Sequence, residues 1–463
     1  MTDPHSFRSL GLPEPVLANL EQLGYRTLTP IQAASLPLAL AGHDLLAQAK
    51  TGSGKTAAFA LPLLAKLEAR DFAVQALVLC PTRELAEQVR GEIRRLARAE
   101  ENLKVLALCG GSPIRPQLAS LEHGAHVVVG TPGRLLDHLK RGTLKLDGLK
   151  TLVLDEADRM LEMGFLEDVR AVAQRCPQER QTLLFSATFP EAIVELARRF
   201  LRDPREVRLA EQHAPGKIRQ RFYEVAEDER LRTVVRLLEH FRPERTLAFC
   251  NTRQQCRELL AVLEGRGLVA LALHGELEQV ERDQVLVQFA NRSTSVLVAT
   301  DVAARGLDIA ELEAVVNVEL APDPEVHVHR IGRTGRVDAE GWAFSLVARR
   351  EFVRVERIAE LQGAPVEWHP LAELKPAKRE PLLPPMVTLQ ISGGRREKIR
   401  AGDVLGALTG AAGLSGEQVG KISVGELSTY VAVERGIGQS ALAKLSAGRL
   451  KGRSVRVRLL PAQ

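Results

Sequence analysis

The sequence has 463 residues, of which 45% are hydrophobic, so it is too long for one compact core and apolar enough to fill two or three. Its five cysteines form no Cys-x-x-Cys pair, which excludes a zinc site or disulfide framework of the usual spacing and fits a reducing compartment. No apolar run reaches the roughly 20 residues that span a bilayer, and the N-terminus lacks the pattern of a secretory signal. We therefore expect a soluble, cytoplasmic protein with no membrane partner.

Positive charge is concentrated in the last part of the chain. Residues 386–463 carry 12 Lys and Arg against 5 Asp and Glu, whereas the remaining residues carry 51 against 53. The stretch just before, 375–385, is polar and proline-rich, which disfavours both helix and strand. We predict a linker over residues 371–385 and a separate basic domain over residues 386–463.

Upstream of the linker, short β-branched or leucine-rich runs alternate with helical patterns, as in a parallel sheet covered by helices. A first set of runs covers residues 44–47, 76–80, 126–129, 151–154 and 182–185, and a second set covers 246–250, 271–273, 295–299 and 314–318. Residues 202–216 lie between the two sets and are predicted to be a hinge. One helical pattern has an apolar stripe formed by Leu85, Val89, Ile93 and Leu96. The prediction is two α/β domains, over residues 1–208 and 217–370.

Polar or glycine-rich clusters follow these runs, at the sheet edge where open α/β folds bind ligands. Any one cluster could be an ordinary turn, but eight at equivalent positions indicate a binding edge. They cover residues 49–56, 81–83, 131–134, 155–158, 186–188, 251–253, 274–275 and 300–301.

The cluster at residues 49–56 fits a phosphate-binding loop, except that Ala49 replaces the usual first glycine. Gly52 and Gly54 allow backbone amides to approach phosphate oxygens, and the helix that follows presents its positive end. We expect Lys55 to contact the β and γ phosphates of ATP and Thr56 to hold Mg²⁺. The other members of the predicted loop are Lys50, Thr51 and Ser53.

Asp155 and Glu156 follow the run 151–154, where a strand would bring them beside the magnesium. We predict that Asp155 coordinates the metal through water and that Glu156 orients or deprotonates the attacking water. The structural alternative is a helix N-cap followed by an acidic first turn. Arg333 and Arg336 could act as arginine fingers at the γ phosphate, or could form a plain anion patch. The finger interpretation requires the two domains to close during hydrolysis.

Residues 155–158 read Asp-Glu-Ala-Asp, and the chain resembles the DEAD-box RNA helicases over nearly its whole length. That family also has Ala at the first position of the phosphate loop. One departure is Glu276, where the family more often has Asp, at a position that contacts neither the nucleotide nor the fingers. The other family motifs stand in order at Phe7 with 25–32, and at 81–86, 110–111, 131–134, 186–188, 303–308 and 329–336.

The resemblance implies two RecA-like parallel-sheet domains in tandem and an RNA-stimulated ATPase that unwinds short RNA duplexes. It implies that Gln32 reads adenine beside Phe7 and Tyr25, and that Asp308 approaches the ribose. The residues that would couple the nucleotide to RNA are Asp158, Ser186, Thr188 and His329. Because the implied RNA contacts go to the backbone, the core should not read sequence. These contacts are Arg83, Gly111, Thr131, Arg134, Arg253, Arg282 and Thr300.

The basic domain shows the pattern β-α-β-β-α-β, with strands at 387–391, 421–424, 428–433 and 454–459 and helices at 401–409 and 440–445. This order suggests an α+β domain like an RRM, a common RNA-binding frame. Its only aromatic residue, Tyr430, is placed by alternation on the predicted open face of the sheet. Cations would then bind RNA, or would only keep the domain soluble. They are Arg395, Arg396, Lys398, Arg400, Lys451, Arg453, Arg456 and Arg458.

Residues 393–410 and 451–460 resemble the C-terminal domain of the bacterial DbpA branch of this family. In that branch the domain tethers the helicase to 23S ribosomal RNA, which implies a role in assembly of the large ribosomal subunit. ATP and Mg²⁺ are the implied cofactors, and no obligate protein partner is expected. An ATP-gated RNA clamp and a DNA helicase are the competing classes. Lys55, Glu156 and the two fingers argue against a clamp, and Gln32 with the Asp-Glu-Ala-Asp sequence favours RNA over DNA.

Overall fold

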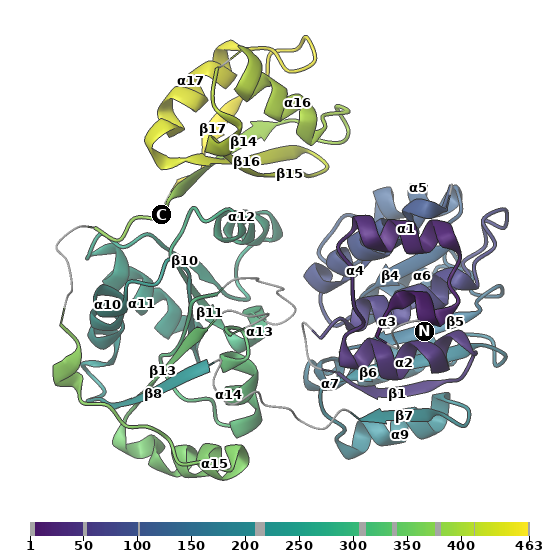
Figure 1. The fold of residues 1–463 in the computed structure, drawn as a ribbon, viewed down its shortest axis with the longest axis horizontal. Coiled ribbons are helices and arrows are strands. Elements are labelled where there is room, and N and C mark those ends of the chain that lie inside the picture. Colours follow the sequence, from purple (N-terminus) through teal and green to yellow (C-terminus); the bar gives the residue numbers. More distant parts are fainter. Residues whose placement is uncertain are drawn as a thin grey trace. The chain divides into compact units, whose positions relative to one another are not determined.

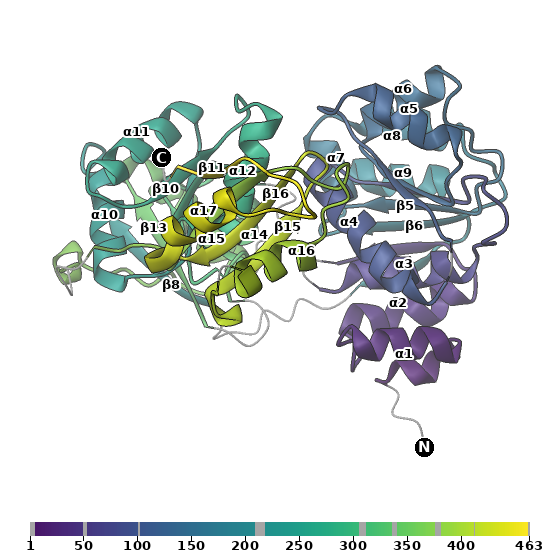
Figure 2. The ribbon, with the colours of Figure 1, turned by 90° about the horizontal axis from the view of Figure 1, so that it is seen from above.

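A computed structural model describes residues 5–49, 53–100, 102–208, 218–304, 312–335, 340–375, 381–411 and 413–461. These residues form two compact units, one up to Arg208 and one from Ile218 onward, whose elements are drawn in Figures 1 and 2. Within the described ranges, no helix combines the length and the apolar character that crossing a membrane requires.

A seven-stranded parallel sheet forms the middle of the first unit, with strand order β3-β4-β2-β5-β6-β1-β7. The five predicted runs are confirmed as β1, β2, β4, β5 and β6, and β3 and β7 were not predicted. Because β7 is a strand, the predicted hinge is wrong over that part, and residues 209–217 lie outside the described ranges. The strands are β1 (Leu45–Gln48), β2 (Ala76–Leu79), β3 (Val105–Leu108), β4 (Val127–Gly130), β5 (Thr151–Asp155), β6 (Gln181–Ser186) and β7 (Arg205–Arg208).

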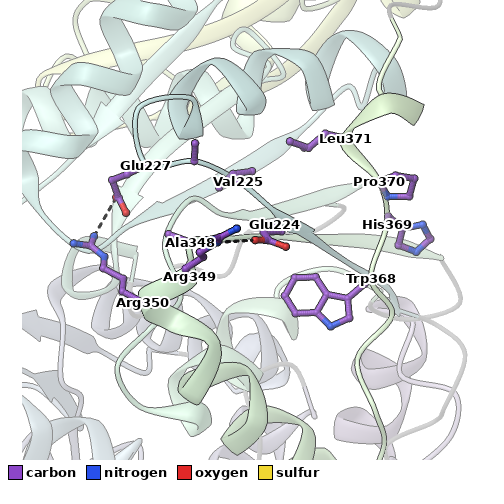
Figure 3. A pocket seen from close by; sticks show the side chains of 11 residues that line it. Glu224, Val225, Glu227, Ala348, Arg349, Arg350, Trp368, His369, Pro370 and Leu371 are labelled. Carbon is purple, nitrogen blue, oxygen red and sulfur yellow. Dashed lines mark hydrogen bonds and ion pairs between the residues drawn. The ribbon is translucent and has the colours of Figure 1, made fainter.

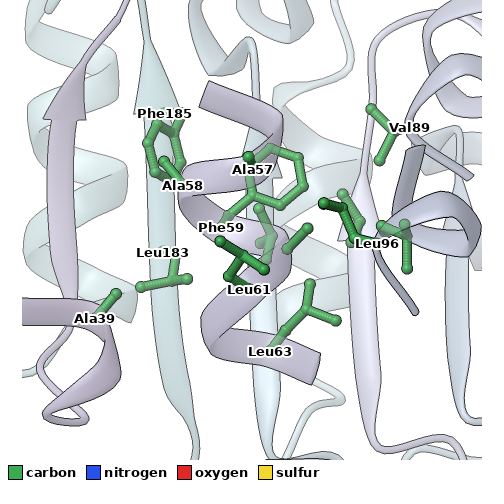
Figure 4. Packing of buried hydrophobic residues seen from close by; sticks show 14 of the residues in the cluster. Ala39, Ala57, Ala58, Phe59, Leu61, Leu63, Val89, Leu96, Leu183 and Phe185 are labelled. Carbon is green, nitrogen blue, oxygen red and sulfur yellow. The ribbon is translucent and has the colours of Figure 1, made fainter. Parts of the chain in front are cut away.

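Helices cover both faces of this sheet, so its central strands are buried on both sides. Figure 4 shows one face, where Phe59 packs against Phe185 of β6 with ring centroids 5.6 Å apart. The predicted stripe from Leu85 to Leu96 is confirmed as the buried face of α4. The helices are α1 (Glu14–Gln22), α2 (Pro30–Leu40), α3 (Lys55–Ala65), α4 (Arg83–Leu96), α5 (Ile114–Glu122), α6 (Pro132–Lys140), α7 (Ala157–Glu162), α8 (Leu166–Ala173) and α9 (Glu191–Phe200).

The second unit contains a six-stranded parallel sheet with strand order β10-β11-β9-β12-β13-β8. The four predicted runs are confirmed as β9 to β12, and β8 and β13 extend the sheet on one side. The strands are β8 (Ile218–Glu224), β9 (Thr246–Cys250), β10 (Ala270–Leu273), β11 (Val296–Thr300), β12 (Ala314–Asn317) and β13 (Gly341–Val347). The helices are α10 (Arg230–Phe241), α11 (Arg253–Glu264), α12 (Gln279–Ala290), α13 (Asp301–Ala304), α14 (Pro324–Ile331) and α15 (Phe352–Gln362).

The C-terminal domain, also in the second unit, has the predicted β-α-β-β-α-β order and an antiparallel sheet, β15-β16-β14-β17. Its apolar core lies between one face of this sheet and the two helices. Past α16 the chain continues as a π-helical turn (Ala407–Ala411), where one longer helix was predicted. The elements are β14 (Met386–Ser392), α16 (Ala401–Gly406), β15 (Val419–Val424), β16 (Ser428–Glu434), α17 (Gly438–Ala447) and β17 (Val457–Leu459).

The other face of the C-terminal sheet is not open as predicted. Thr388 of β14 is 1% exposed, and its hydroxyl is hydrogen-bonded to Ser293 Oγ at 2.7 Å and to Asn291 Nδ2 at 3.1 Å, just after α12. Tyr430 lies on this same face and is half-buried; burial raises its pKa, and the carboxylate of Asp283 in α12 adds to the shift. The prediction of an open face around Tyr430 is therefore wrong, because residues that follow and line α12 cover part of it.

Candidate functional site

The phosphate-loop residues that the structure describes surround the start of α3. Gly54 has φ +90° and directly precedes Lys55, and a Cβ at Gly54 would lie 2.6 Å from Gln32 Nε2, so only glycine fits there. Gln32 donates from Nε2 to the carbonyl oxygen of Gly54 at 3.0 Å. Ala49 N donates to Ser186 O at 2.8 Å, which ties the end of β1 to the end of β6. Lys50, Thr51 and Gly52 lie outside the described residues.

Lys55 forms a buried charge cluster with the two predicted catalytic carboxylates. Its Nζ lies 3.0 Å from Asp155 Oδ1 and 3.0 Å from Glu156 Oε1, and all three side chains are at most 6% exposed. Arg159 Nη1 lies 2.9 Å from Glu156 Oε2 and completes the cluster. Burial alone would lower the pKa of Lys55, but Asp155 and Glu156 outweigh it and raise the pKa above its usual value. Burial also raises the pKa of Asp155, although Lys55 opposes the shift.

Glu156 is positioned by an unusual backbone conformation. It has φ +54°, in the left-handed region, between the end of β5 and the start of α7. This conformation costs a non-glycine residue about 1–2 kcal/mol, and such strain tends to occur at functional sites. Here it turns the Glu156 carboxylate back to Lys55. The second oxygen of Asp155, Oδ2, is buried and accepts no hydrogen bond from a described residue, so it can still accept a bond from a metal-bound water.

The residues predicted to couple nucleotide and RNA in the first unit lie together. Asp158 Oδ2 accepts hydrogen bonds from Ala187 N at 3.1 Å, Thr188 N at 2.9 Å and Thr188 Oγ1 at 3.1 Å. Asp158 N donates to Ser186 Oγ at 3.1 Å. One carboxylate of the Asp-Glu-Ala-Asp sequence therefore fixes the whole turn that follows β6.

The two aromatic residues that the resemblance groups with Gln32 contact each other. Phe7 and Tyr25 meet edge to face with ring centroids 5.9 Å apart, and Tyr25 Oη donates to Glu92 Oε1 of α4 at 2.7 Å. Gln32 closes a capping box at the start of α2, where its Oε1 accepts from Thr29 N at 3.0 Å. Both ends of the Gln32 amide thus have protein partners, at Thr29 and Gly54.

The predicted RNA contacts of the first unit lie at the carboxyl ends of three neighbouring strands. Arg83 opens α4 after β2, Gly111 follows β3, and Thr131 and Arg134 follow β4. Thr131 Oγ1 accepts from Gly110 N at 3.2 Å, and Arg134 Nη1 donates to Ser112 O at 3.0 Å, which joins the loops after β3 and β4.

The predicted RNA contacts of the second unit also lie at one edge of its sheet, at the ends of β9 and β11 and on α12. Arg282 donates from Nη2 to Ala303 O at 2.8 Å, and Thr300 ends β11. Arg253 Nη1 lies 2.8 Å from Glu276 Oε1, so the departure at Glu276 affects a predicted RNA contact more directly than expected.

Sequence reasoning missed Arg330, which stands between His329 and the predicted fingers. Arg330 is 2% exposed and donates to both carboxylate oxygens of Asp301, at 2.7 and 2.6 Å, and to Asn251 Oδ1 at 2.8 Å. It therefore holds together the ends of β9, β11 and α14, of which the first two carry predicted polar clusters and the third begins the family motif at 329–336. Arg333 is buried, whereas Arg336 and Asp308 lie outside the described residues.

Two cationic loops meet in the C-terminal domain. Residues 395–400 follow β14 and residues 451–453 precede β17, and the cations in them are exposed. Lys451 Nζ donates to Lys398 O and lies 3.2 Å from Asp403 Oδ2, which holds the two loops together. Arg458 instead donates to Gln390 on the sheet, so β17 is not part of this group.

Comparisons with known proteins agree with this arrangement. Three family models match: DEAD/DEAH box helicase over residues 29–196, Helicase conserved C-terminal domain over 229–338, and DbpA RNA binding domain over 388–459. The ATP-dependent RNA helicase DbpA of Escherichia coli (strain K12) is 53% identical over 97% of this chain and 98% of its own. The DEAD-box ATP-dependent RNA helicase CshA of Geobacillus kaustophilus is 45% identical over 76% of each chain. The solved structure of S. cerevisiae Dbp5 bound to RNA and ADP BeF3 has a TM-score of 0.73 and 30% identity, over 79% of this chain and 96% of its own.

Proposed function

Because the chain belongs to the DbpA type of DEAD-box ATP-dependent RNA helicases, we propose that it unwinds short RNA duplexes during assembly of the large ribosomal subunit. In this proposal the C-terminal domain tethers it to 23S ribosomal RNA, in the cytoplasm, and its RNA-stimulated ATPase supplies the energy. The observation that carries the tether is the pair of cationic loops, 395–400 and 451–453, held together in a domain that matches the DbpA RNA binding domain.

In the ATP site, Lys55 binds the β and γ phosphates, and Mg²⁺ is held by Thr56 and, through water, by Asp155. The buried Oδ2 of Asp155 fits this role because it has no hydrogen bond of its own among the described residues. Glu156 orients the attacking water, and Mg²⁺ neutralises charge on the phosphates. The adenine is read by Gln32 beside Phe7 and Tyr25. We extend the same proposal to Asp308 at the ribose and to Arg333 and Arg336 as fingers.

RNA is held by its backbone at the strand ends of both units, and Asp158 transmits the nucleotide state to the Ser186–Thr188 turn through its hydrogen bonds. His329 has the same coupling role in the second unit. The proposed backbone contacts are Arg83, Gly111, Thr131, Arg134, Arg253, Arg282 and Thr300. Because the fingers and the ATP loop belong to different units, residues 1–208 by themselves should bind ATP but hydrolyse it slowly.

Crosslinking with sequencing of the bound RNA tests the tether. The comparison is between the full chain, a chain that ends at Pro385, and a full chain with Arg395, Arg396, Lys451 and Arg453 changed to Gln. The control changes Arg458 to Gln, because Arg458 lies on β17 and donates to Gln390 on the sheet instead of joining the two loops. We expect 23S ribosomal RNA with the full chain and with the control, and unselective RNA with the other two. Recovery of the same 23S region by the four-residue variant would refute the proposed role of the loops.

A further inference from the structure

A groove of about 920 Å³ opens at the carboxyl ends of β8 and β13 in the second unit. Figure 3 shows its three walls. They are the end of β8 and the turn after it, with Glu224 and Glu227; the turn after β13, with Arg349 and Arg350; and the segment that carries Trp368. This volume is in the range of sites for ligands the size of a nucleotide. None of these residues belongs to the ATP or RNA contacts proposed above.

An exposed tryptophan lines the groove. The chain has only two tryptophans, and Trp368 is 46% exposed. Phe222 and Phe352 contact its indole edge to face, with centroid distances of 6.1 and 5.5 Å, so the ring is held in place from the protein side. A rigid, exposed indole is a favourable platform for stacking an unpaired base, and such stacking contributes about 1–3 kcal/mol per base.

The charged groups of the groove balance one another. Arg349 Nε lies 3.4 Å from Glu224 Oε1, and Arg350 Nη2 lies 3.1 Å from Glu227 Oε1. The Arg349 side chain is 91% exposed, and an exposed ion pair of this kind is weak, so Arg349 and Glu224 are both available to a ligand. Glu227 also lies 3.2 Å from Arg230, and Arg350 also lies 2.9 Å from Glu319, so each keeps a second protein partner when it turns to a ligand. Two carboxylates and two guanidinium groups beside an indole suit a ligand with hydrogen-bond donors and acceptors on an aromatic ring. A ligand bound mainly through phosphate charge would need an excess of cations here.

We propose that this groove binds one unpaired guanine of an RNA strand. The base stacks on Trp368, and its adjacent N1–H and N2–H donors face the carboxylates of Glu224 and Glu227, while Arg349 and Arg350 face O6 or the flanking phosphate. Guanine is favoured because adenine and cytosine present one amino group on that edge and uracil presents one imino group. The inference rests on the proposed function, since RNA held by the helicase supplies the unpaired base. A free guanine nucleotide has the same chemistry and is the alternative source.

Fluorescence of Trp368 tests the site directly. In the full chain with Trp342→Phe, Trp368 is the single tryptophan, and a stacked base quenches its emission. We expect the pentamer UUGUU to quench at about tenfold lower concentration than UUAUU or UUUUU, as one two-donor contact allows. The double change Glu224→Gln with Glu227→Gln should remove this preference. The matched control, Glu356→Gln with Glu360→Gln on the exposed side of α15, should keep it.

Equal quenching by the three pentamers, or no quenching by any, would overturn the proposal. GMP that quenches at a concentration as low as UUGUU would overturn RNA as the source. RNA-stimulated ATPase activity on unrelated RNA separates this inference from the proposed function, because Trp368→Ala should leave it unchanged. If the natural chain itself lacks RNA-stimulated ATPase activity, the helicase proposal fails whatever Trp368 shows.

Discussion

Replacing Lys55 by Met should destabilise the first unit strongly at neutral pH and less in acid. The change removes the ammonium group 3.0 Å from both Asp155 and Glu156. Asp155 is then buried with no cation in contact, and Arg159, which pairs with Glu156, is the cation that remains in the cluster. Removing one partner of a buried ion pair costs about 3–5 kcal/mol. The free energy of unfolding of residues 1–208 should therefore fall by about that amount at pH 8.

The pH dependence follows from the raised pKa of Asp155. Burial already raises this pKa, and the variant loses the Lys55 charge that opposed the shift, so the pKa rises further. A carboxyl group with a raised pKa binds its proton more tightly in the folded state. Its contribution to stability is therefore present below the pKa of the unfolded chain and is lost as pH rises through the folded pKa. Between pH 8 and pH 5, the free energy of unfolding of the variant should rise by about 1.4 kcal/mol for each pH unit over which its folded state holds one proton more than its unfolded state.

Urea unfolding of residues 1–208 at pH 8 and pH 5 measures both effects. The control is Lys140→Met, which changes an exposed lysine of α6 and should cost little at either pH. A destabilisation by Lys55→Met that is the same at pH 5 and pH 8 would refute the argument from Asp155. A loss below about 1 kcal/mol at pH 8 would show that the cluster is not buried as described.

Three other changes test separate contacts. Asp158→Asn weakens the three hydrogen bonds to the turn at Thr188. We expect the KM for ATP to be unchanged but about tenfold fewer duplexes to be unwound per ATP hydrolysed, which corresponds to about 1.4 kcal/mol of lost coupling. An unchanged number of duplexes unwound per ATP, in a combined ATPase and unwinding assay, would contradict this. Glu276→Gln releases Arg253, so RNA should bind more tightly, and the slope of log affinity against log salt concentration should steepen by about one. Anisotropy titrations that show the same slope for the variant would exclude Arg253 as an RNA contact. Thr388→Val leaves its two buried polar partners unsatisfied and should cost the second unit about 1–3 kcal/mol, which an unaltered thermal transition would disprove.

Much of the fold could be predicted because buried parallel strands read as continuous apolar runs. Leu77 and Val78 of β2 and the runs of β9 to β12 are examples, and the polar clusters after them locate the functional edge of each sheet. Four strands were missed: β3 and β13 carry mostly apolar runs that were overlooked, whereas β7 and β8 lack such a run. Of β7 only Val207 is buried, and β8 begins with Ile218 followed by three consecutive polar residues, so neither pattern stands out from a loop.

Within the site, the residue types could be predicted from motifs, but their partners could not. The cluster around Lys55 is a set of contacts between residues about 100 positions apart, and no spacing rule gives such distances. The role of Arg330 depends on its burial, which is rare for arginine and therefore not expected from sequence. The covering of Tyr430 depends on how two domains meet, and alternation along a strand carries no information about that.

The charge cluster also predicts that ATP and Mg²⁺ bind cooperatively. When the phosphates of ATP take Lys55, Asp155 loses the cation in contact with it, Glu156 keeps only Arg159, and the incoming phosphates add negative charge nearby. Mg²⁺ restores the balance, because it supplies two positive charges to the carboxylates and the phosphates together. Affinity for a fluorescent ATP analogue should therefore fall at least about tenfold when Mg²⁺ is removed with EDTA, at about 1.4 kcal/mol for each factor of ten. In the Asp155→Asn variant, removing Mg²⁺ should lower the affinity for the ATP analogue less, since one of the two carboxylates that compete with the phosphates for a cation is gone. Equal affinities with and without Mg²⁺ in the natural chain would mean that Lys55 can leave the carboxylates without a replacement cation.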